Sequence, residues 1–322
     1  MDFKKFGIKI EMLKSSIWER LPVCDRGSVE DAVFIAGSAR SGTTWLADIL
    51  LNYNNNYRLI FEPLHPKYTD RAKILAHKYL RPACENNNFS QAIKAVIAGQ
   101  IQNKWINRKN RKLFAKKRLI KSIRSNLLLK WIHTNFPFVP IILLLRHPCA
   151  VALSRMKCGW KPKIQLLLGQ DRLMEDYLSP FLPLVKKQKT EFEDQILFWC
   201  IENFVPLCQF MPGEIQIVFY ENLCVQPGEE LRRAFRFIGN TYSDKVLKAI
   251  KKPSVTIHAK SAIISHQDLI SGYKRSLTQH DIGKAVTIIS NFGLDKIYGN
   301  EPMPKIKGAD CLEIFNQKKR EH

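Results

Sequence analysis

Acidic residues are scarce in this chain and absent from one long stretch of it. Lys and Arg number 51 against 29 Asp and Glu, a formal net charge of +22 over 322 residues. Residues 86–170 contain no Asp or Glu, and the same 85 residues carry 17 Lys or Arg. A run of charged residues usually forms a solvent-exposed face. A span this long without acidic residues nevertheless indicates a positively charged surface beside a multiply charged anion. The imbalance predicts an anionic partner: a nucleotide, an acidic glycan, nucleic acid or an anionic membrane.

Cysteine motifs and long apolar runs are missing as well. The eight cysteines form no C-x-x-C and lie near no His at zinc-finger spacing, and Cys149 and Cys200 are expected to be core thiols. The longest apolar run, Phe136–Leu145, contains two prolines and is too short to span a bilayer, and no secretory signal is visible. We therefore expect a soluble, cytoplasmic chain.

A glycine-bearing turn lacks the lysine of the common nucleotide-binding loop. Val33–Ala36 is typical of a buried strand, Gly37 follows it, and apolar residues then recur at helical spacing. Backbone N–H groups converge at such a turn, and the helix dipole and Arg40 add positive charge. The spacing approaches G-x-x-x-x-G-K-[ST], but Thr43 stands in place of the lysine and the cation comes earlier, at Arg40. The turn predicts a phosphate site of unusual type.

A second strand lacks the acid expected of a magnesium site. Ile141–Leu145 is a continuous apolar run that ends at Arg146-His147-Pro148. In ATPases and kinases with a nucleotide-binding loop, the corresponding strand commonly ends in an Asp that helps to hold Mg²⁺. The missing lysine of the loop and the missing Asp at the end of this strand both argue against a site for a Mg-nucleoside triphosphate. They favour an anion held directly by Arg, hydroxyls and backbone N–H groups.

Strands and helices alternate along the rest of the chain. Further strands are predicted at Tyr57–Phe61, Leu119–Ile123 and Ile215–Phe219. Residues 67–135 are expected to be mostly helical, and the later helices are Leu173–Lys187, Glu191–Phe210, Gly228–Ile238 and, as the last, Gln279–Phe292. This pattern predicts an α/β fold, a P-loop-like doubly wound parallel sheet flanked by helices in three layers. Its carboxyl edge would bring together Gly37, Glu62, Lys121, Arg146 and Tyr220.

No internal repeat or long linker divides the chain. We expect an N-terminal basic amphipathic segment at 1–30, one domain at 31–300 and a C-terminal tail at 301–322. Residues 1–20 are predicted to form a helix with lysines between its apolar positions. This helix either lies on a membrane surface or docks on its own domain.

These motifs resemble those of sulfotransferases that use 3′-phosphoadenosine 5′-phosphosulfate (PAPS). The resemblance covers roughly residues 31–299. It rests on four segments, 40–45 (RSGTTW), 145–155 (LRHPCAVALSR), 61–64 (FEPL) and 219–223 (FYENL), and on two pieces of the C-terminal loop, 251–254 (KKPS) and 272–277 (GYKRSL). The first two segments resemble the 5′-phosphosulfate loop and the 3′-phosphate motif. The FEPL segment is similar to that of carbohydrate sulfotransferases.

The resemblance implies a role for each matching residue. The phosphosulfate would be held by Arg40, Ser41, Gly42, Thr43 and Thr44. Arg146 and Ser154 would hold the 3′-phosphate, with Lys274 or Arg275 closing over it. Trp45 would stack on the adenine and Tyr220 would lie near it, although both aromatic residues also suit the core.

Transfer of the sulfuryl group to an acceptor hydroxyl or amine needs a base and positive charge, and no metal. Cytosolic small-molecule sulfotransferases place a catalytic His two residues after a strand Lys, but here Lys121 is followed at that distance by Ile123. The catalytic residues are therefore expected to be Glu62 as the base, with Lys121 and Arg40 as cations, although Glu62 also suits a structural ion pair. His65 is a weaker base candidate, His147 is expected to be structural, and His133 has no evident partner.

The acceptor is less determined than the chemistry. The Glu-Pro segment, the loop Arg and the acid-free region favour a carbohydrate, possibly anionic, over a lipid, a peptide tyrosine or a small alcohol. A P-loop small-molecule kinase and a non-catalytic polyanion-binding protein remain as rival interpretations. The chain has no recognised nucleic-acid motif.

Overall fold

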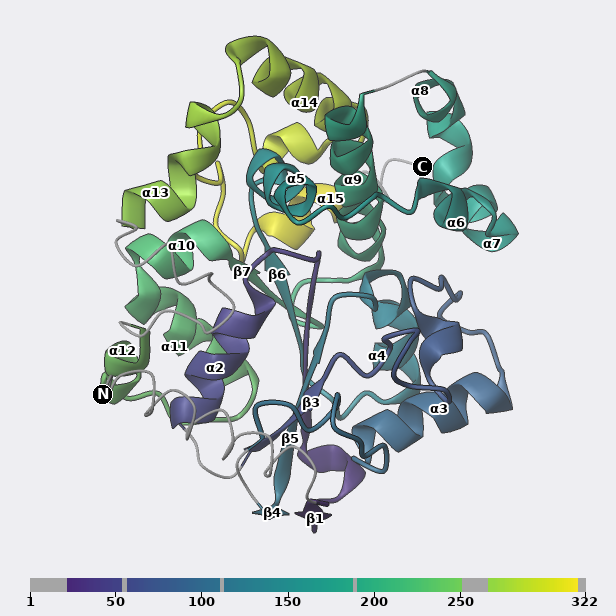
Figure 1. Ribbon diagram of the computed structural model, residues 1–322, viewed down its shortest axis with the longest axis vertical. Helices are drawn as coiled ribbons and strands as arrows, with labels where there is room; N and C mark the ends of the chain where they lie inside the picture. Colours follow the sequence, from purple (N-terminus) through teal and green to yellow (C-terminus); the bar gives the residue numbers. More distant parts are fainter. Residues whose placement is uncertain (1–21, 54–56, 111–112, 188–189, 251–265, 318–322) are drawn as a thin grey trace, which may run out of the picture.

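A five-stranded parallel sheet forms the centre of the protein (Figure 1). The computed structural model describes residues 22–53, 57–110, 113–187, 190–250 and 266–317. The sheet order is β3-β5-β2-β6-β7, and a separate parallel pair joins β1 to β4. The strands are β1 (Cys24–Asp25), β2 (Ala32–Gly37), β3 (Tyr57–Phe61), β4 (Phe114–Ala115), β5 (Lys117–Ser122), β6 (Ile141–Leu145) and β7 (Gln216–Phe219). Strand order reverses around β2, which places a ligand crevice beyond its carboxyl end.

Alternation along the strands explains the layers on the two faces of the sheet. In β2, Val33 and Ile35 belong to one apolar cluster, while Phe34 and Ala36 belong to the other. The first cluster includes residues of α2 (Thr43–Tyr53), α11 (Pro227–Phe237) and α12 (Lys245–Ile250). The second includes residues of α3 (Asn87–Ile97) and α4 (Leu129–Asn135) on the opposite side (Figure 1). The predicted three-layer α/β fold is confirmed.

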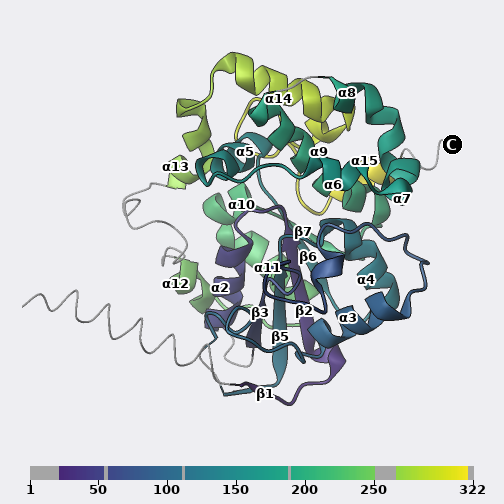
Figure 2. The ribbon, with the colours of Figure 1, turned by 45° about the vertical axis from the view of Figure 1, so that its right-hand side comes forward.

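A group of helices lies over the carboxyl ends of the strands (Figures 1 and 2). Its members are α5 (Pro148–Lys157), α9 (Glu191–Gln209), α10 (Tyr220–Val225), α13 (His266–Ser271) and α14 (Gln279–Asn291). Helix α9 begins with a capping box between Thr190 and Glu193 and packs against α5 and α14. These helices cover this end of the sheet.

Two expectations about helices are wrong. Residues 67–135 are not mostly helical, because α3 and α4 alternate there with turns and 3₁₀ segments. The expected helix Leu173–Lys187 is present, since residues 171–186 are helical without a break after the short α6 (Ile164–Leu168). It is irregular, because α7 (Asp171–Leu173), a π turn, a 3₁₀ turn and α8 (Leu182–Lys186) follow one another directly, and Pro180 and Pro183 each lack an N–H for the α-helical bond. Helix α14 is not the last, since α15 (Cys311–Gln317) follows and packs on α9.

The predicted core thiols are confirmed. Cys149 and Cys200 are fully buried, and burial raises the pKa of the Cys149 thiol to about 12. Among the helices of the described residues, none is long and apolar enough to cross a membrane. The basic segment at residues 1–20 and the motif at 251–254 lie outside the described residues.

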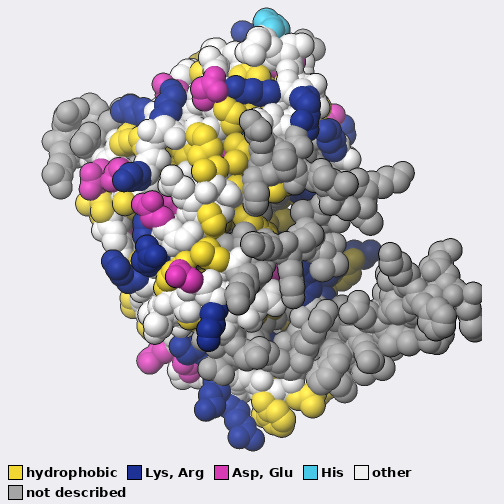
Figure 3. Space-filling view, turned by 90° about the vertical axis from the view of Figure 1, so that its left-hand side faces the viewer, with side chains coloured by type: hydrophobic (Ala, Val, Ile, Leu, Met, Phe, Trp, Pro, Cys, Tyr) yellow, Lys and Arg dark blue, Asp and Glu magenta, His cyan; other side chains and the backbone are white. Residues whose placement is uncertain are grey.

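One face of the molecule shows how the positive charge is distributed. On the left-hand side of Figure 1, Lys and Arg side chains are scattered around a hydrophobic area in the upper half of the face (Figure 3). The charge drawn on this face is therefore not gathered into one continuous patch.

Candidate functional site

The glycine-bearing loop joins β2 to α2 and is tightly constrained. Arg40 and Gly42 have positive φ angles of 74° and 96°. A Cβ atom at Gly42 would lie 2.5 Å from the Tyr220 ring, so only glycine fits without displacement. Ser41 and Thr43 are buried, and Ser41 Oγ donates to the carbonyl of Ser38 at 2.7 Å. The first N–H groups of α2 have no partner within the helix and are available to an anion.

Two arginines of the second motif hold consecutive carbonyls of this loop. Arg155 Nε donates to the Ala39 carbonyl at 3.1 Å, and Arg146 Nη1 donates to the Arg40 carbonyl at 3.1 Å. Both arginines come from the segment that leaves β6 and forms α5. The two sequence motifs are thus joined by direct hydrogen bonds.

Five of the predicted donor-binding residues meet at this junction. Arg40 Nε donates to Ser154 Oγ at 2.9 Å, and the Arg146 guanidinium lies 4.2 Å from the Tyr220 ring centroid. Trp45 meets the same Tyr220 ring edge-on, with centroids 5.5 Å apart. Arg146 Nη2 donates to a carbonyl of α13, but its Nε is buried and has no hydrogen-bond partner within the described residues. Arg146 Nε is therefore a donor on a charged group for which the described residues supply no acceptor.

His147 lies beneath this junction and is held as a neutral ring. Burial lowers its pKa to about 4, and its backbone N–H donates to Glu221 at 2.9 Å. The ring stacks on Tyr273 with centroids 4.6 Å apart. Tyr273 belongs to a 3₁₀ turn, Gly272–Arg275, that carries Lys274 and Arg275. Lys274 pairs with Glu301 at 3.0 Å, so the expected lysine of the C-terminal loop is already engaged at the surface.

Glu62 and Lys121 form a second centre at the carboxyl ends of β3 and β5. The Glu62 side chain is buried and accepts from the Lys121 ammonium, from Arg124 Nη1 at 2.9 Å and from the Ile123 N–H at 3.2 Å. Burial lowers the pKa of Lys121, and the adjacent Glu62 opposes that shift. Three donors therefore converge on one carboxylate.

The backbone of Glu62 is not in the extended form that a residue before proline usually adopts. Its φ is 46°, in the left-handed region that a non-glycine residue rarely adopts. The backbone N–H donates to the Lys121 carbonyl at 2.8 Å, and the His65 N–H closes a turn on the Glu62 carbonyl at 3.1 Å. These bonds, with the donors on the side chain, outweigh the restriction imposed by Pro63. Glu62 does lie at a strand end, as expected.

A buried polar network under the loop was not predicted from the sequence. Glu202 of α9 accepts from Ser38 Oγ at 2.9 Å and from Arg155 Nη2 at 2.7 Å, and Asn203 Nδ2 donates to Ser38 Oγ at 3.0 Å. All four side chains are buried. One sequence signal was present, because Glu202 stands inside the apolar run of α9.

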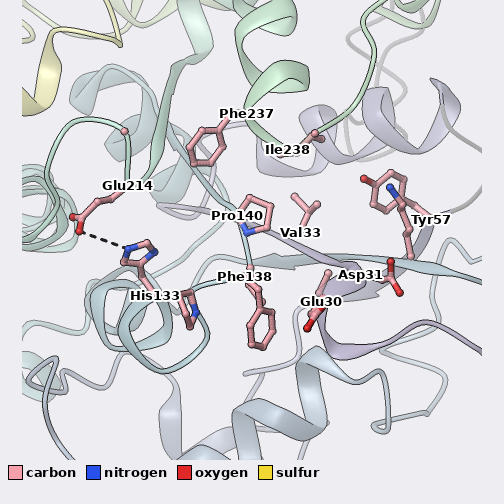
Figure 4. A pocket seen from close by; sticks show the side chains of 16 residues that line it. Glu30, Asp31, Val33, Tyr57, His133, Phe138, Pro140, Glu214, Phe237 and Ile238 are labelled. Carbon is pink, nitrogen blue, oxygen red and sulfur yellow. Dashed lines mark ion pairs between the residues drawn. The ribbon is translucent and has the colours of Figure 1, made fainter.

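The cavity in Figure 4 lies at the opposite edge of the sheet. It has a volume of about 420 Å³ and is lined by residues at the amino ends of the strands, among them Tyr57, Phe138 and Pro140. His133 does have a partner there, since its Nε2 lies 3.6 Å from Glu214 Oε1. No predicted site residue lines this cavity.

The parallel sheet and the strand-to-helix loop with converging arginines define an α/β enzyme that binds phosphate-like anions. A family model for the sulfotransferase domain matches residues 30–281. The chain belongs to the sulfotransferase domain family, which confirms the predicted enzyme class and its donor PAPS. The match does not extend to the carbohydrate subtype.

Solved structures of other sulfotransferases are similar at low identity. Mouse sulfotransferase SULT7A1 complexed with PAP is 12% identical, with 94% of this chain and 93% of that chain covered and a TM-score of 0.47. The sulfotransferase domain from the curacin biosynthetic pathway is 17% identical, with 85% and 98% covered and a TM-score of 0.42. The corresponding domain of the Synechococcus PCC 7002 olefin synthase is 17% identical, with 85% and 96% covered and a TM-score of 0.43. A comparison with curated proteins finds no match. These structural likenesses carry no argument about the site.

Proposed function

We propose that this enzyme transfers the sulfuryl group of PAPS to a hydroxyl group of a carbohydrate. The observation that carries the proposal is the arrangement at one edge of the sheet. The anion-binding loop follows β2, Arg146 follows β6, and the Glu62–Lys121 pair lies at the ends of β3 and β5. Because β2 lies between β5 and β6, the loop sits between the Glu62–Lys121 pair and Arg146.

The residues of the loop and of the second motif fit the two anionic ends of PAPS. Ser41, Gly42, Thr43 and Thr44 surround the start of α2, where N–H groups and the helix dipole favour a phosphosulfate. The buried Nε of Arg146 lacks an acceptor within the described residues, which suits a 3′-phosphate beside Ser154. Trp45 and Tyr220 offer ring surface for the adenine.

Arg40 and the C-terminal cations need a rearrangement to act as proposed. Arg40 donates to Ser154, so it must release that hydroxyl in order to reach the phosphosulfate. Lys274 must likewise leave Glu301 in order to approach the 3′-phosphate, and Arg275, on the same turn, is the alternative cation.

The proposed reaction forms one bond and breaks another at sulfur. The acceptor oxygen forms a bond to sulfur, the bond from sulfur to the 5′-phosphate oxygen breaks, and adenosine 3′,5′-bisphosphate (PAP) leaves. Glu62 takes the acceptor proton, while Lys121 and Arg40 offset the negative charge on the transferring oxygens. The buried position and left-handed backbone of Glu62 support a functional role, because such strain concentrates at active sites. When Glu62 takes the proton, one of its three hydrogen bonds must be released, and of the two cationic side chains that donate to it Arg124 is the more exposed.

The carbohydrate acceptor is supported by two features of the chain. Glu62-Pro63 resembles the segment of the carbohydrate enzymes, and the region without acids, residues 86–170, includes β5, which carries Lys121. Both features suit a hydroxyl-bearing acceptor, and the second suits an anionic one.

Thermal unfolding with three ligands tests the donor site. PAP should raise Tm by several degrees, since a ligand at 100 times its Kd stabilises by about 2.7 kcal/mol. ATP with Mg²⁺ and heparin should raise it less. Stabilisation by ATP-Mg or heparin without stabilisation by PAP would instead support the kinase or the polyanion-binding interpretation.

The variant Glu62→Gln extends the same experiment to the base. PAP should stabilise this variant as well as the unchanged enzyme, while turnover falls by at least about a hundredfold. Substantial residual turnover would remove Glu62 from the role of base.

A further inference from the structure

A cluster of three rings lies directly beside Glu62. Tyr68 stacks on Trp105 with ring centroids 4.2 Å apart and planes 20° apart. His65 contacts both rings, at 4.6 Å from each. Trp105 Nε1 donates to the Glu62 carbonyl at 3.3 Å, which ties the rings to the proposed base. We call His65, Tyr68 and Trp105 the ring cluster.

The ring cluster is partly open to solvent. Tyr68 is 38% exposed, and His65 and Trp105 are half-buried. The rings come from two loops, one after β3 and one after α3, and the Asn103 side chain joins the loops by donating to the Tyr68 carbonyl at 2.8 Å. An exposed aromatic surface held in place beside a reactive group is a binding feature rather than core packing.

Unpaired cations flank the rings. The Arg108 guanidinium lies 4.8 Å from the Trp105 ring centroid and 5.0 Å from that of Phe61. Lys67 Nζ lies 5.6 Å from the Tyr68 ring centroid. In the described part of the chain, neither Lys67 nor Arg108 has a carboxylate partner. Their charges are available to an anion bound beside the rings.

His65 adds a neutral hydrogen-bond donor. Its Nδ1 accepts from the Lys67 N–H at 3.2 Å, which leaves the ring proton on Nε2. Burial and the charge of Arg124 lower the pKa of His65 below its usual value, so the ring is neutral at pH 7. In this form Nε2 can donate to a hydroxyl of a bound ligand, while the Nδ1 lone pair is already engaged by the Lys67 N–H.

We propose that the ring cluster, with Lys67 and Arg108, binds an acceptor sugar that carries a carboxylate, a uronic acid residue of an acidic polysaccharide. One face of the sugar ring packs on the exposed surface of Tyr68, the carboxylate meets Lys67 with the charge of Arg108 beside it, and a hydroxyl reaches Glu62. The assignment rests on the proposed function, which makes Glu62 and Lys121 the transfer centre. An apolar phenol would require exposed apolar contacts around its ring, whereas the neighbouring Phe61 is buried and the cations Lys67 and Arg108 lie beside the rings.

The test compares two aromatic truncations of equal exposure. Phe138 is 39% exposed and lies at the cavity on the opposite edge of the sheet (Figure 4). With unsulfated chondroitin as acceptor, Tyr68→Ala should raise the acceptor KM about tenfold and leave the KM for PAPS unchanged. Phe138→Ala should change neither. An unchanged chondroitin KM in Tyr68→Ala, or an equal effect of Phe138→Ala, overturns the proposal.

Charge is tested separately with Lys67→Gln and a neutral glycan. Lys67→Gln should weaken the sulfation of chondroitin and leave any activity on dextran unchanged, because dextran carries no carboxylate. Turnover of dextran or 2-naphthol but not of chondroitin would exclude the uronic acid. If PAP still raises Tm in that case, the donor site stands and only the acceptor assignment falls.

Discussion

Gly42 illustrates how a single residue shapes the donor loop. Its φ of 96° already disfavours any side chain, and the Tyr220 ring occupies the place of a Cβ atom. Gly213 has a similar φ of 91°, but a Cβ atom there would have no neighbouring atom within 4 Å. An added side chain would meet backbone strain at both glycines but steric contact only at Gly42, so comparing the two positions separates the two effects.

Gly42→Ala should weaken PAP binding by at least about tenfold, because Tyr220 and the loop must shift apart. It should also lower the free energy of unfolding by more than Gly213→Ala does. The Gly213 variant loses only the cost of placing an alanine in a left-handed backbone, about 1–3 kcal/mol. Titration calorimetry with PAP and urea unfolding of both variants measure the two effects. Equal losses in the two variants would show that contact with Tyr220 does not matter.

Five of the residues predicted from the sequence share one property. Glu62, Lys121, Arg146 and Tyr220 lie at or next to the carboxyl end of a strand, Arg40 lies in the loop that follows β2, and parallel strands bring such ends together. Trp105 and Tyr68 follow no such rule, because loops of irregular path carry them to Glu62. The left-handed backbone of Glu62 was also beyond prediction, since it results from donors that converge from separate segments.

Helices α5 and α9 are coupled by a buried ion pair. Arg155 and Glu202 are almost completely buried, and Glu202 also accepts from Ser38 of the donor loop. A buried charge whose partner is removed is strongly destabilising, whereas an apolar replacement of both charges often is not.

Glu202→Leu should lower the free energy of unfolding by about 3–5 kcal/mol, because Arg155 stays buried without a carboxylate. The double variant Arg155→Met/Glu202→Leu should recover most of that loss, as measured by urea unfolding. Glu191→Ala is the matched control on the same helix, since its partner Lys161 is 74% exposed and the pair should contribute little. Additive losses in the double variant would contradict a coupled pair.

Helix boundaries were predictable where the apolar periodicity extends over many residues and the helix has a capping motif at its start. Helix α9 matches its expected bounds within one residue, and its capping box is visible in the sequence as Thr190 and Glu193. The helix at 171–186 was predictable from its apolar spacing, but its changes between α, π and 3₁₀ hydrogen bonding were not, because Pro180 and Pro183 remove N–H donors from it. Helix α15 is stabilised by packing on α9 more than by its own seven residues.

Two buried histidines make the stability of the whole protein depend on pH. Burial lowers the pKa of His77 from 6.5 to about 3 and that of His147 from 6.5 to about 4. At these two side chains the unfolded state therefore binds more protons than the folded state below pH 6.5. The stabilisation is fully present above pH 6.5 and is lost as the pH falls toward 4.

Urea unfolding should show this loss as the pH is lowered from 7 to 5, with about 2 kcal/mol from each histidine. His77→Gln should flatten the dependence, and the same change at exposed His280 should leave it as it is. A pH dependence that is unaltered in His77→Gln would assign the effect to other groups.

The bonds between Arg40 and Ser154 and between Arg146 and the α13 carbonyl have a thermodynamic consequence for donor binding. Before PAPS arrives, these guanidinium N–H groups already donate hydrogen bonds within the protein. Where such a group turns to a phosphate oxygen, binding exchanges one bond for another, so that contact yields only the difference between the two bonds. The donor affinity will be lower than a count of contacts in the complex suggests, and the release of PAP after transfer will be correspondingly easier.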